Sequence, residues 1–225
     1  MKIGILQTGH APEMVLGELG DYDTMFARLL DGHGFTFRTW NVVDQDYPNT
    51  PSDADGWLIT GSKHGAYEDH PWIPPLETFI RDIYTDGRPL VGVCFGHQII
   101  AQALGGTVEK FKGGWAVGRT RYEMEGAPLD LNAWHQDQVV TLPPEARVIG
   151  SNDFCANAAL LYGNRAYSIQ PHPEFTSRMV EQLIKHRGQG VVPDDLLAEA
   201  EARLAAPTSG DTIARRIAEF FKQER

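Results

Sequence analysis

The chain has 225 residues, of which 42% are hydrophobic and 22% are charged, and its formal net charge is −10 at pH 7. This length allows one substantial domain but not two large ones. The negative charge argues against nucleic acid or an anionic membrane as a partner, because both carry negative charge themselves. The only cysteines are Cys94 and Cys155, so we expect no disulfide framework and a cytoplasmic location.

The first half of the chain alternates strand-like and helix-like segments, which is typical of a parallel sheet wrapped by helices. One glycine-flanked loop, residues 61–65, follows a predicted strand. Its backbone N–H groups can face an anion, although an ordinary strand-to-helix turn explains the pattern equally well. The expected strands cover residues 1–6, 35–43, 56–60 and 90–93, and the expected helices lie around residues 22–30, 76–83 and 95–104.

The pattern changes after Gly105-Gly106. Residues 107–111 and 115–124 predict short antiparallel strands added to an edge of the sheet. Further strands are expected near residues 146–150, 158–162 and 166–170, and helices over residues 177–186, 194–205 and 212–223. We expect residues 189–225 to form a helical extension packed on the same domain, with a partner-docking surface as the alternative.

Residues 90–98, LVGVCFGHQ, predict a buried strand that runs directly into a helix. Cys94 lies on the turn between them, at the carboxyl end of the strand and the positive end of the helix, and both features favour a thiolate. Gly92 and Gly96 flank it with the spacing of a nucleophile elbow. The G-x-C-x-G pattern alone leaves an ordinary buried cysteine equally open.

A second candidate group follows the last predicted strand. Pro171 and Pro173 exclude His172 from a regular helix or a central ladder and hold its ring on a rigid turn. Glu174 supplies a carboxylate two residues later, so the segment offers a base and an orienting group for a nucleophile. His172 is far from Cys94 in the sequence, but parallel topology places both at carboxyl ends of strands.

Two further residues are ambiguous from the sequence. His135 and Asp137 are two residues apart and provide groups for catalysis, although such residues more often satisfy backbone groups of a loop. Cys155 lies in a loop whose only nearby charge is Asp153, so we expect it to be inert.

The motifs GVCFGHQ at residues 92–98 and HPE at residues 172–174 together resemble those of the class I glutamine amidotransferases. The resemblance covers residues 1–188 and implies an α/β fold: a flavodoxin-like three-layer sandwich with a mostly parallel central sheet, helices on both faces and a small antiparallel extension. It also implies that Cys94 is the nucleophile, that His172 is the general base and acid, and that Glu174 fixes the imidazole tautomer.

The same resemblance assigns residues to the substrate. Gly61 and Ser62 match the family's oxyanion loop, so the N–H groups of Ser62 and Phe95 are the expected oxyanion donors. This chain has Gly61-Ser62-Lys63 where relatives usually have Gly-Gly-Pro, which leaves the geometry of the oxyanion hole and the preference for free glutamine open. The other implied substrate contacts are Gln98 and the main chain of Trp134, His135 and Gln136.

These residues predict a cysteine-dependent amidohydrolase that converts glutamine to glutamate and ammonia through a thioester. A γ-glutamyl peptidase acting on γ-glutamyl peptides or conjugates is the first alternative. A non-catalytic binding module is the second. Amidotransferases of this class usually pass ammonia to a synthetase, so a separate synthetase subunit is a possible partner.

No metal or cofactor is expected in the reaction. The eight histidines and two cysteines show no His-x-x-x-His or paired-cysteine spacing of a zinc site, and we expect His64 and His70 to lie at the surface. There is also no P-loop and no dinucleotide fingerprint, so the chain should not activate an acceptor with ATP by itself.

Overall fold

A computed structural model describes all residues 1–225, and its centre is a nine-stranded sheet with the strand order β2-β1-β3-β4-β11-β10-β9-β6-β7. The strands from β2 to β11 in this order run parallel, and the remainder pair antiparallel. The parallel strands are β1 (Lys2–Leu6), β2 (Thr36–Trp40), β3 (Gly56–Ile59), β4 (Leu90–Val93) and β11 (Ala166–Ile169). The antiparallel strands are β6 (Ala116–Met124), β7 (Ala127–His135), β9 (Ala146–Ser151) and β10 (Ala159–Tyr162).

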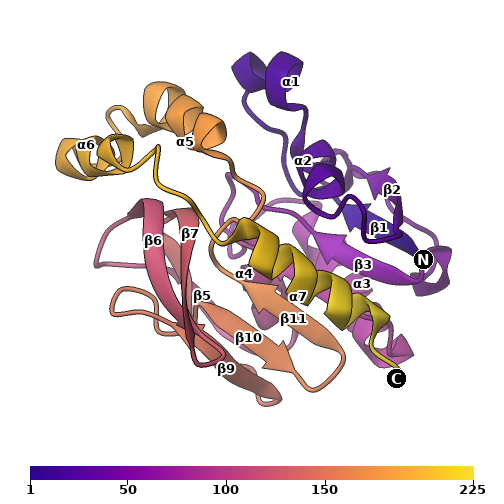
Figure 1. Ribbon diagram of the computed structural model, residues 1–225. Helices are drawn as coiled ribbons and strands as arrows, with labels where there is room; N and C mark the ends of the chain where they lie inside the picture. The colour runs from indigo at the N-terminus through magenta and orange to yellow at the C-terminus, as the bar shows by residue number, and fades with distance from the viewer.

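Helices cover both faces of the parallel part of the sheet (Figure 1). One apolar core contains side chains of α3 and α4, and a second contains side chains of α2 and α7. These two cores confirm the predicted flavodoxin-like three-layer arrangement. The helices are α1 (Glu13–Leu19), α2 (Tyr22–Leu29), α3 (Ile73–Asp86), α4 (Phe95–Ala103), α5 (Ser177–Leu183), α6 (Asp194–Ala202) and α7 (Gly210–Lys222), with 3₁₀ turns at Val42–Asp44 and Pro51–Asp53 and a π-helical turn at Ile184–Gly188.

Strand β4 lies inside the parallel part, hydrogen-bonded to β3 on one side and β11 on the other. All four of its residues are buried, as a short apolar run requires when both faces of a sheet are covered. Because the three strands run in the same direction, their carboxyl ends meet at one edge. The segments that follow β3, β4 and β11 are therefore neighbours in space.

The pairing of the short strand after α4 differs from the expectation. Strand β5 (Thr107–Lys110) pairs with β8 (Asp137–Thr141) in a separate two-stranded sheet and does not extend the edge of the main one. Val108 and Val139 bury this small sheet against the core on the α3 and α4 side. The alternation of side chains predicted a strand there, but it carries no information about the strand's partner.

Strand β7 was not expected over its full length, and α1 lies in a segment for which no helix was expected. Pro128, Asp130 and Asn132 disfavour a strand by propensity, yet β7 pairs with β6 along nine residues. The hairpin between them turns through Glu125 and Gly126, both with positive φ, which matches the twist of the paired strands. Pairing across the hairpin therefore overrides the local preference.

None of the helices combines the length and the apolar character that crossing a membrane requires.

Helix α7 crosses one face of the sheet near the C-terminus of the chain (Figure 1). Phe221 is only 2% exposed, and its ring meets that of Phe35 edge to face with centroids 5.7 Å apart. Gly56 of β3 is in close contact with the same ring, since a Cβ atom there would lie 3.0 Å from it. The end of the chain thus contributes to the core beside the first strands.

We expect Phe221→Ala to lower the free energy of unfolding by about 3–5 kcal/mol, because it leaves a cavity between α7 and the sheet. Urea unfolding, followed by circular dichroism, should show one transition with a lower midpoint. Glu219→Ala, which changes an exposed residue of the same helix, should alter the stability by less than about 0.5 kcal/mol. An unchanged midpoint for Phe221→Ala, or two separate transitions in the unchanged protein, would show that α7 does not unfold with the domain.

Candidate active site

Cys94 lies on the turn between β4 and α4, where its backbone adopts φ 54° and ψ −105°. A positive φ is uncommon for a residue with a side chain and costs of order 1–3 kcal/mol. Hydrogen bonds hold the turn: the N–H of Cys94 donates to the carbonyl of Ile169 (2.9 Å), and its own carbonyl accepts from the N–H of Gln98 (3.1 Å). The thiol therefore projects from the carboxyl end of the sheet in one fixed orientation.

Gly92 and Gly96 are required by close packing around this turn. A Cβ atom on Gly92 would lie 2.4 Å from the carbonyl oxygen of Gly96. A Cβ atom on Gly96 would lie 2.3 Å from the carbonyl oxygen of Ile59 in β3. Both distances are well inside van der Waals contact, so the G-x-C-x-G pattern reflects the approach of α4 to the sheet.

His172 is held just beyond the end of β11. The main-chain N–H of His172 donates to the carbonyl of Asn132 in β7 (2.8 Å), and the imidazole ring stacks on Phe175 with centroids 3.9 Å apart. Its Nδ1 lies 2.7 Å from Oε1 of Glu174, whose side chain is completely buried. This hydrogen bond places the Nδ1 proton toward the carboxylate and leaves Nε2 for a second partner.

Gly61 connects the end of β3 to the other two strand ends. A Cβ atom on Gly61 would lie 3.0 Å from Cε1 of His172 and 3.7 Å from Cβ of Cys94, so the three residues are in near contact. They open into one cavity of about 400 Å³. The residues predicted from the sequence that line this cavity are Gly61, Ser62, Cys94, Gln98, Trp134, His135, Gln136 and His172.

The two remaining predicted residues lie next to the cavity lining. Phe95 is buried and is the first residue of α4, so its N–H has no partner within that helix. Glu174 is buried beside His172, with Oε2 free of any hydrogen bond. The structure thus places all ten predicted residues at or beside one cavity.

The charges at the site raise the proton affinity of His172. Burial lowers the pKa of this imidazole, but the negative charges of Glu174 and Cys94 together outweigh burial and raise the pKa above its ordinary value. A protonated His172 places positive charge beside the sulfur. A protonated imidazole beside a cysteine sulfur is an arrangement that nucleophilic cysteines use.

Residues 30–187 match the family model of the class I glutamine amidotransferases. The chain is 30% identical to a glutamine amidotransferase-like protein of Schizosaccharomyces pombe, over 97% of this chain and 98% of that protein. The chain belongs to the class I glutamine amidotransferase family. It is also 29% identical to γ-glutamyl peptidase 4 of Arabidopsis thaliana, over 73% of this chain and 72% of that protein.

A solved structure of a glutamine amidotransferase from Methylobacillus flagellatus superposes with a TM-score of 0.75 over 98% of this chain and 93% of that one. The two sequences are 23% identical, so this likeness concerns the fold. It agrees with the sheet order and the layers of helices described above.

Two polar residues of this amidotransferase domain face the cavity with part of their hydrogen-bonding capacity already used. Gln98 donates both amide hydrogens, to the carbonyl of Asp137 (3.0 Å) and to Oε1 of Gln170 (3.1 Å), which leaves its carbonyl oxygen for a ligand. His135 is buried, and burial together with the charge of His172 lowers its pKa to about 3. Its Nδ1 lies 3.3 Å from the main-chain carbonyl oxygen of Asp137. His135 therefore contacts the main chain of Asp137 and not its side-chain carboxylate.

The sequence did not identify the residues that support the reacting groups. Thr8 and Thr60 are fully buried: Oγ1 of Thr8 donates to the carbonyl of Thr60 (2.9 Å), and Oγ1 of Thr60 donates to that of Gly61 (3.1 Å). Asn132 donates from Nδ2 to the carbonyl of Phe175 (2.8 Å). Single threonines and an asparagine in unrelated segments carry no pattern that could have revealed these contacts.

The two cysteines differ in exposure and in charge environment. Both cysteines are buried, but only Cys94 lines the cavity, and burial raises the pKa of the Cys155 thiol to about 12. We expect iodoacetamide to alkylate Cys94 alone, because the Cys94 sulfur faces the cavity and lies beside the protonated His172, whereas Cys155 has neither feature. Peptide mapping by mass spectrometry measures this.

In His172→Ala the alkylation of Cys94 should become slower, because the sulfur loses its neighbouring positive charge. Cys155→Ala should leave the labelling unchanged. Equal labelling of both cysteines, or a rate of Cys94 labelling that His172→Ala does not alter, would contradict the pairing of Cys94 with His172.

Proposed function

We propose that the chain hydrolyses the γ-carboxamide of glutamine through a cysteine thioester and releases glutamate and ammonia. The observation that supports this most directly is that Cys94 and His172 line one cavity, with Nδ1 of His172 2.7 Å from the buried Glu174 carboxylate. A nucleophile, a base and a group that orients the base are the components of an acyl-transfer site.

In the first half of the reaction the Cys94 thiolate attacks the carboxamide carbon, and the carbonyl oxygen becomes an oxyanion. The N–H groups of Phe95 and Ser62 stabilise this charge, an effect worth about 10²–10³ in rate for a single donor. His172 then donates its proton to the nitrogen as the carbon–nitrogen bond breaks, so ammonia leaves and a γ-glutamyl thioester remains.

In the second half His172, now neutral, removes a proton from water as the water attacks the thioester carbon. The tetrahedral intermediate collapses, the carbon–sulfur bond breaks, and glutamate departs. The Cys94 thiolate and the protonated His172 are restored. Glu174 stabilises the imidazolium in both halves and holds Nδ1 protonated, so that Nε2 serves the reaction.

A γ-glutamyl peptidase is the second candidate, and the breadth of the cavity favours it. Beyond the reacting groups the lining includes Trp115, Arg187 and Val191. A volume of about 400 Å³ falls in the range of sites for ligands larger than one amino acid. The Arg187 guanidinium offers a partner for the carboxylate of a peptide leaving group. The chemistry at Cys94 is the same for either substrate.

We expect the purified chain to release glutamate and ammonia from glutamine, and Cys94→Ala to lower kcat by at least about 10⁴-fold. Parallel assays with glutamine and with γ-glutamyl dipeptides, at equal concentrations, compare kcat/KM for the two substrate classes. Cys155→Ala is the matched control and should keep its activity. Preference for γ-glutamyl dipeptides would favour the second candidate, and turnover of neither substrate would support a non-catalytic module.

Gly61 offers a finer test of the site, because a side chain there would push against His172. We expect Gly61→Ala to lower kcat by about 10²-fold with little change in folding, since small misplacements of reacting groups have effects of this size. Gly17→Ala is the matched control: no atom lies within 4 Å of a Cβ at this helical position, so activity should be unchanged. Full activity in Gly61→Ala would contradict the placement of His172 at the reaction centre.

A further inference from the structure

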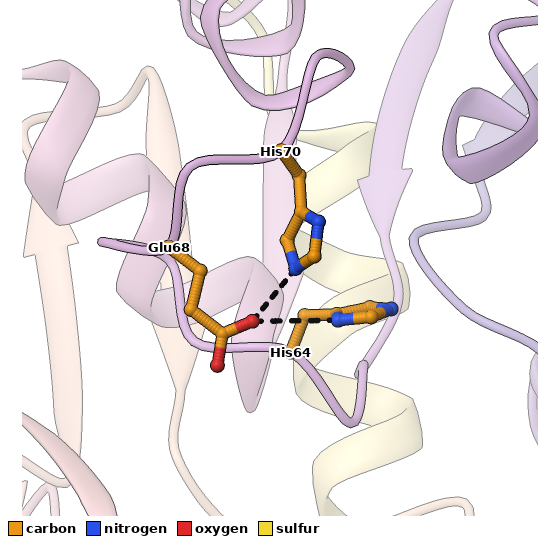
Figure 2. A group of neighbouring side chains, drawn as sticks. All are labelled: His64, Glu68 and His70. Carbon is orange, nitrogen blue, oxygen red and sulfur yellow. Dashed lines mark hydrogen bonds and ion pairs between the residues drawn. The ribbon is translucent and has the colours of Figure 1, made fainter.

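Three side chains that take no part in the proposed reaction point toward one another on the loop between β3 and α3. Figure 2 shows His64, Glu68 and His70 around a common point, with the carboxylate facing both rings. Oε2 of Glu68 lies 2.7 Å from Nε2 of His70 and 3.4 Å from Nδ1 of His64. One nitrogen or oxygen atom from each of the three residues lies within 4.8 Å of the others.

The loop that carries these residues is held in shape by its backbone. The N–H of Glu68 donates to the carbonyl of Gly65 (3.1 Å), and the N–H of His70 donates to that of Glu68 (3.0 Å). Gln102 of α4 donates to the carbonyl of Ala66 (2.7 Å) and anchors the loop to the helix that begins after Cys94. The three side chains therefore start from converging positions, and ordering them costs little free energy.

One side of the cluster is buried and the other is open to solvent. The His70 ring lies parallel to that of the buried Trp72, with centroids 5.9 Å apart, and the His64 and His70 rings are 4.2 Å apart. The side chains of His64, Glu68 and His70 remain 22%, 44% and 32% exposed. The rings are thus oriented by packing while an ion from solvent can reach their nitrogen atoms.

We propose that His64, Glu68 and His70 form a binding site for one divalent transition-metal ion of the zinc class. Two imidazole nitrogens and one carboxylate oxygen are ligands that such ions bind, whereas Mg²⁺ and Ca²⁺ prefer oxygen alone. Zinc bonds of about 2.0–2.1 Å in a tetrahedron place neighbouring ligand atoms about 3.3 Å apart. The spacings here, from 2.7 Å up to 4.8 Å, bracket that value, so small side-chain rotations suffice.

The site would leave the fourth position of the ion to water, and its ligands His64 and Glu68 line the same cavity as Cys94. The N–H of His64 donates to Oγ of Ser62 (3.2 Å), and Trp72 packs on Phe95 with ring centroids 5.4 Å apart. Ser62 and Phe95 carry the proposed oxyanion donors. An ion held by His64 and His70 therefore fixes the loop that presents one of those donors, while its binding does not depend on the proposed reaction.

Binding is measured on the full-length Cys94→Ala chain after treatment with a chelator, because the Cys94 thiolate would otherwise compete for the ion. Titration with Zn²⁺ by calorimetry, and with Co²⁺ by visible absorption, should show one saturable site per chain. Loss of an outer-shell partner typically weakens metal binding about 10–100-fold, so we expect loss of a direct ligand in His70→Ala to weaken it at least tenfold.

Glu68→Gln provides a second variant that keeps the stacked rings of His70 and Trp72 in place, and it should weaken binding as His70→Ala does. His33→Ala is the matched control, since His33 stacks only on Phe35 in this structure. This variant should bind Zn²⁺ as tightly as the Cys94→Ala chain from which it is made. Hydrogen exchange of residues 61–70 should slow when Zn²⁺ is added.

Absence of saturable binding would overturn the proposal and leave Glu68 as an ion-pair partner of two histidines. Equal affinity in the parent, His70→Ala and Glu68→Gln, or protection of a different segment such as that around His10, Asp21 and Asp44, would overturn it as well. Because the Cys94→Ala chain is used throughout, none of these outcomes depends on the glutaminase assay.

Discussion

The close packing of α4 against the sheet is the constraint on which the candidate site depends. The backbone around Gly96 lies so near β3 that its N–H donates to the carbonyl of Thr60 at 3.1 Å, with no space for a side chain. This approach holds Cys94, two residues before Gly96, in a strained conformation with positive φ. The strain persists because hydrogen bonds to Ile169 and Gln98 fix the turn on both sides, and it keeps the sulfur exposed to the cavity.

Parallel pairing then brings together groups that are distant in the sequence. Strand β4 pairs with β3 and β11 in register, with Gly92 opposite both Ile59 and Ser168. The residues that directly follow these three strands therefore lie at the same edge of the sheet. The site is a property of strand order as much as of individual side chains, and the threonine pair that ties β1 to the end of β3 keeps that edge aligned.

Much of the fold followed from the sequence because apolar periodicity and glycine positions are local signals. The strands β1, β3, β4 and β11 and the helices α2, α3, α4 and α7 were predicted within a few residues of their observed bounds. The pairing of β5 with β8 and the length of β7 were not, because a strand's partner depends on contacts far along the chain. At β7 the hairpin with β6 outweighed residues that disfavour strands.

The site shows the same division between local and distant information. The flanking glycines marked Cys94, and the HPE segment placed Glu174 within reach of His172, since both patterns span only a few residues. The His64, Glu68 and His70 cluster escaped notice because its spacing differs from that of common zinc motifs. A backbone turn between Gly65 and Glu68, rather than helical periodicity, brings these side chains together. Loop geometry can thus assemble a ligand set that a search for fixed spacings passes over, and here it does so on the segment that also presents Ser62 to the cavity.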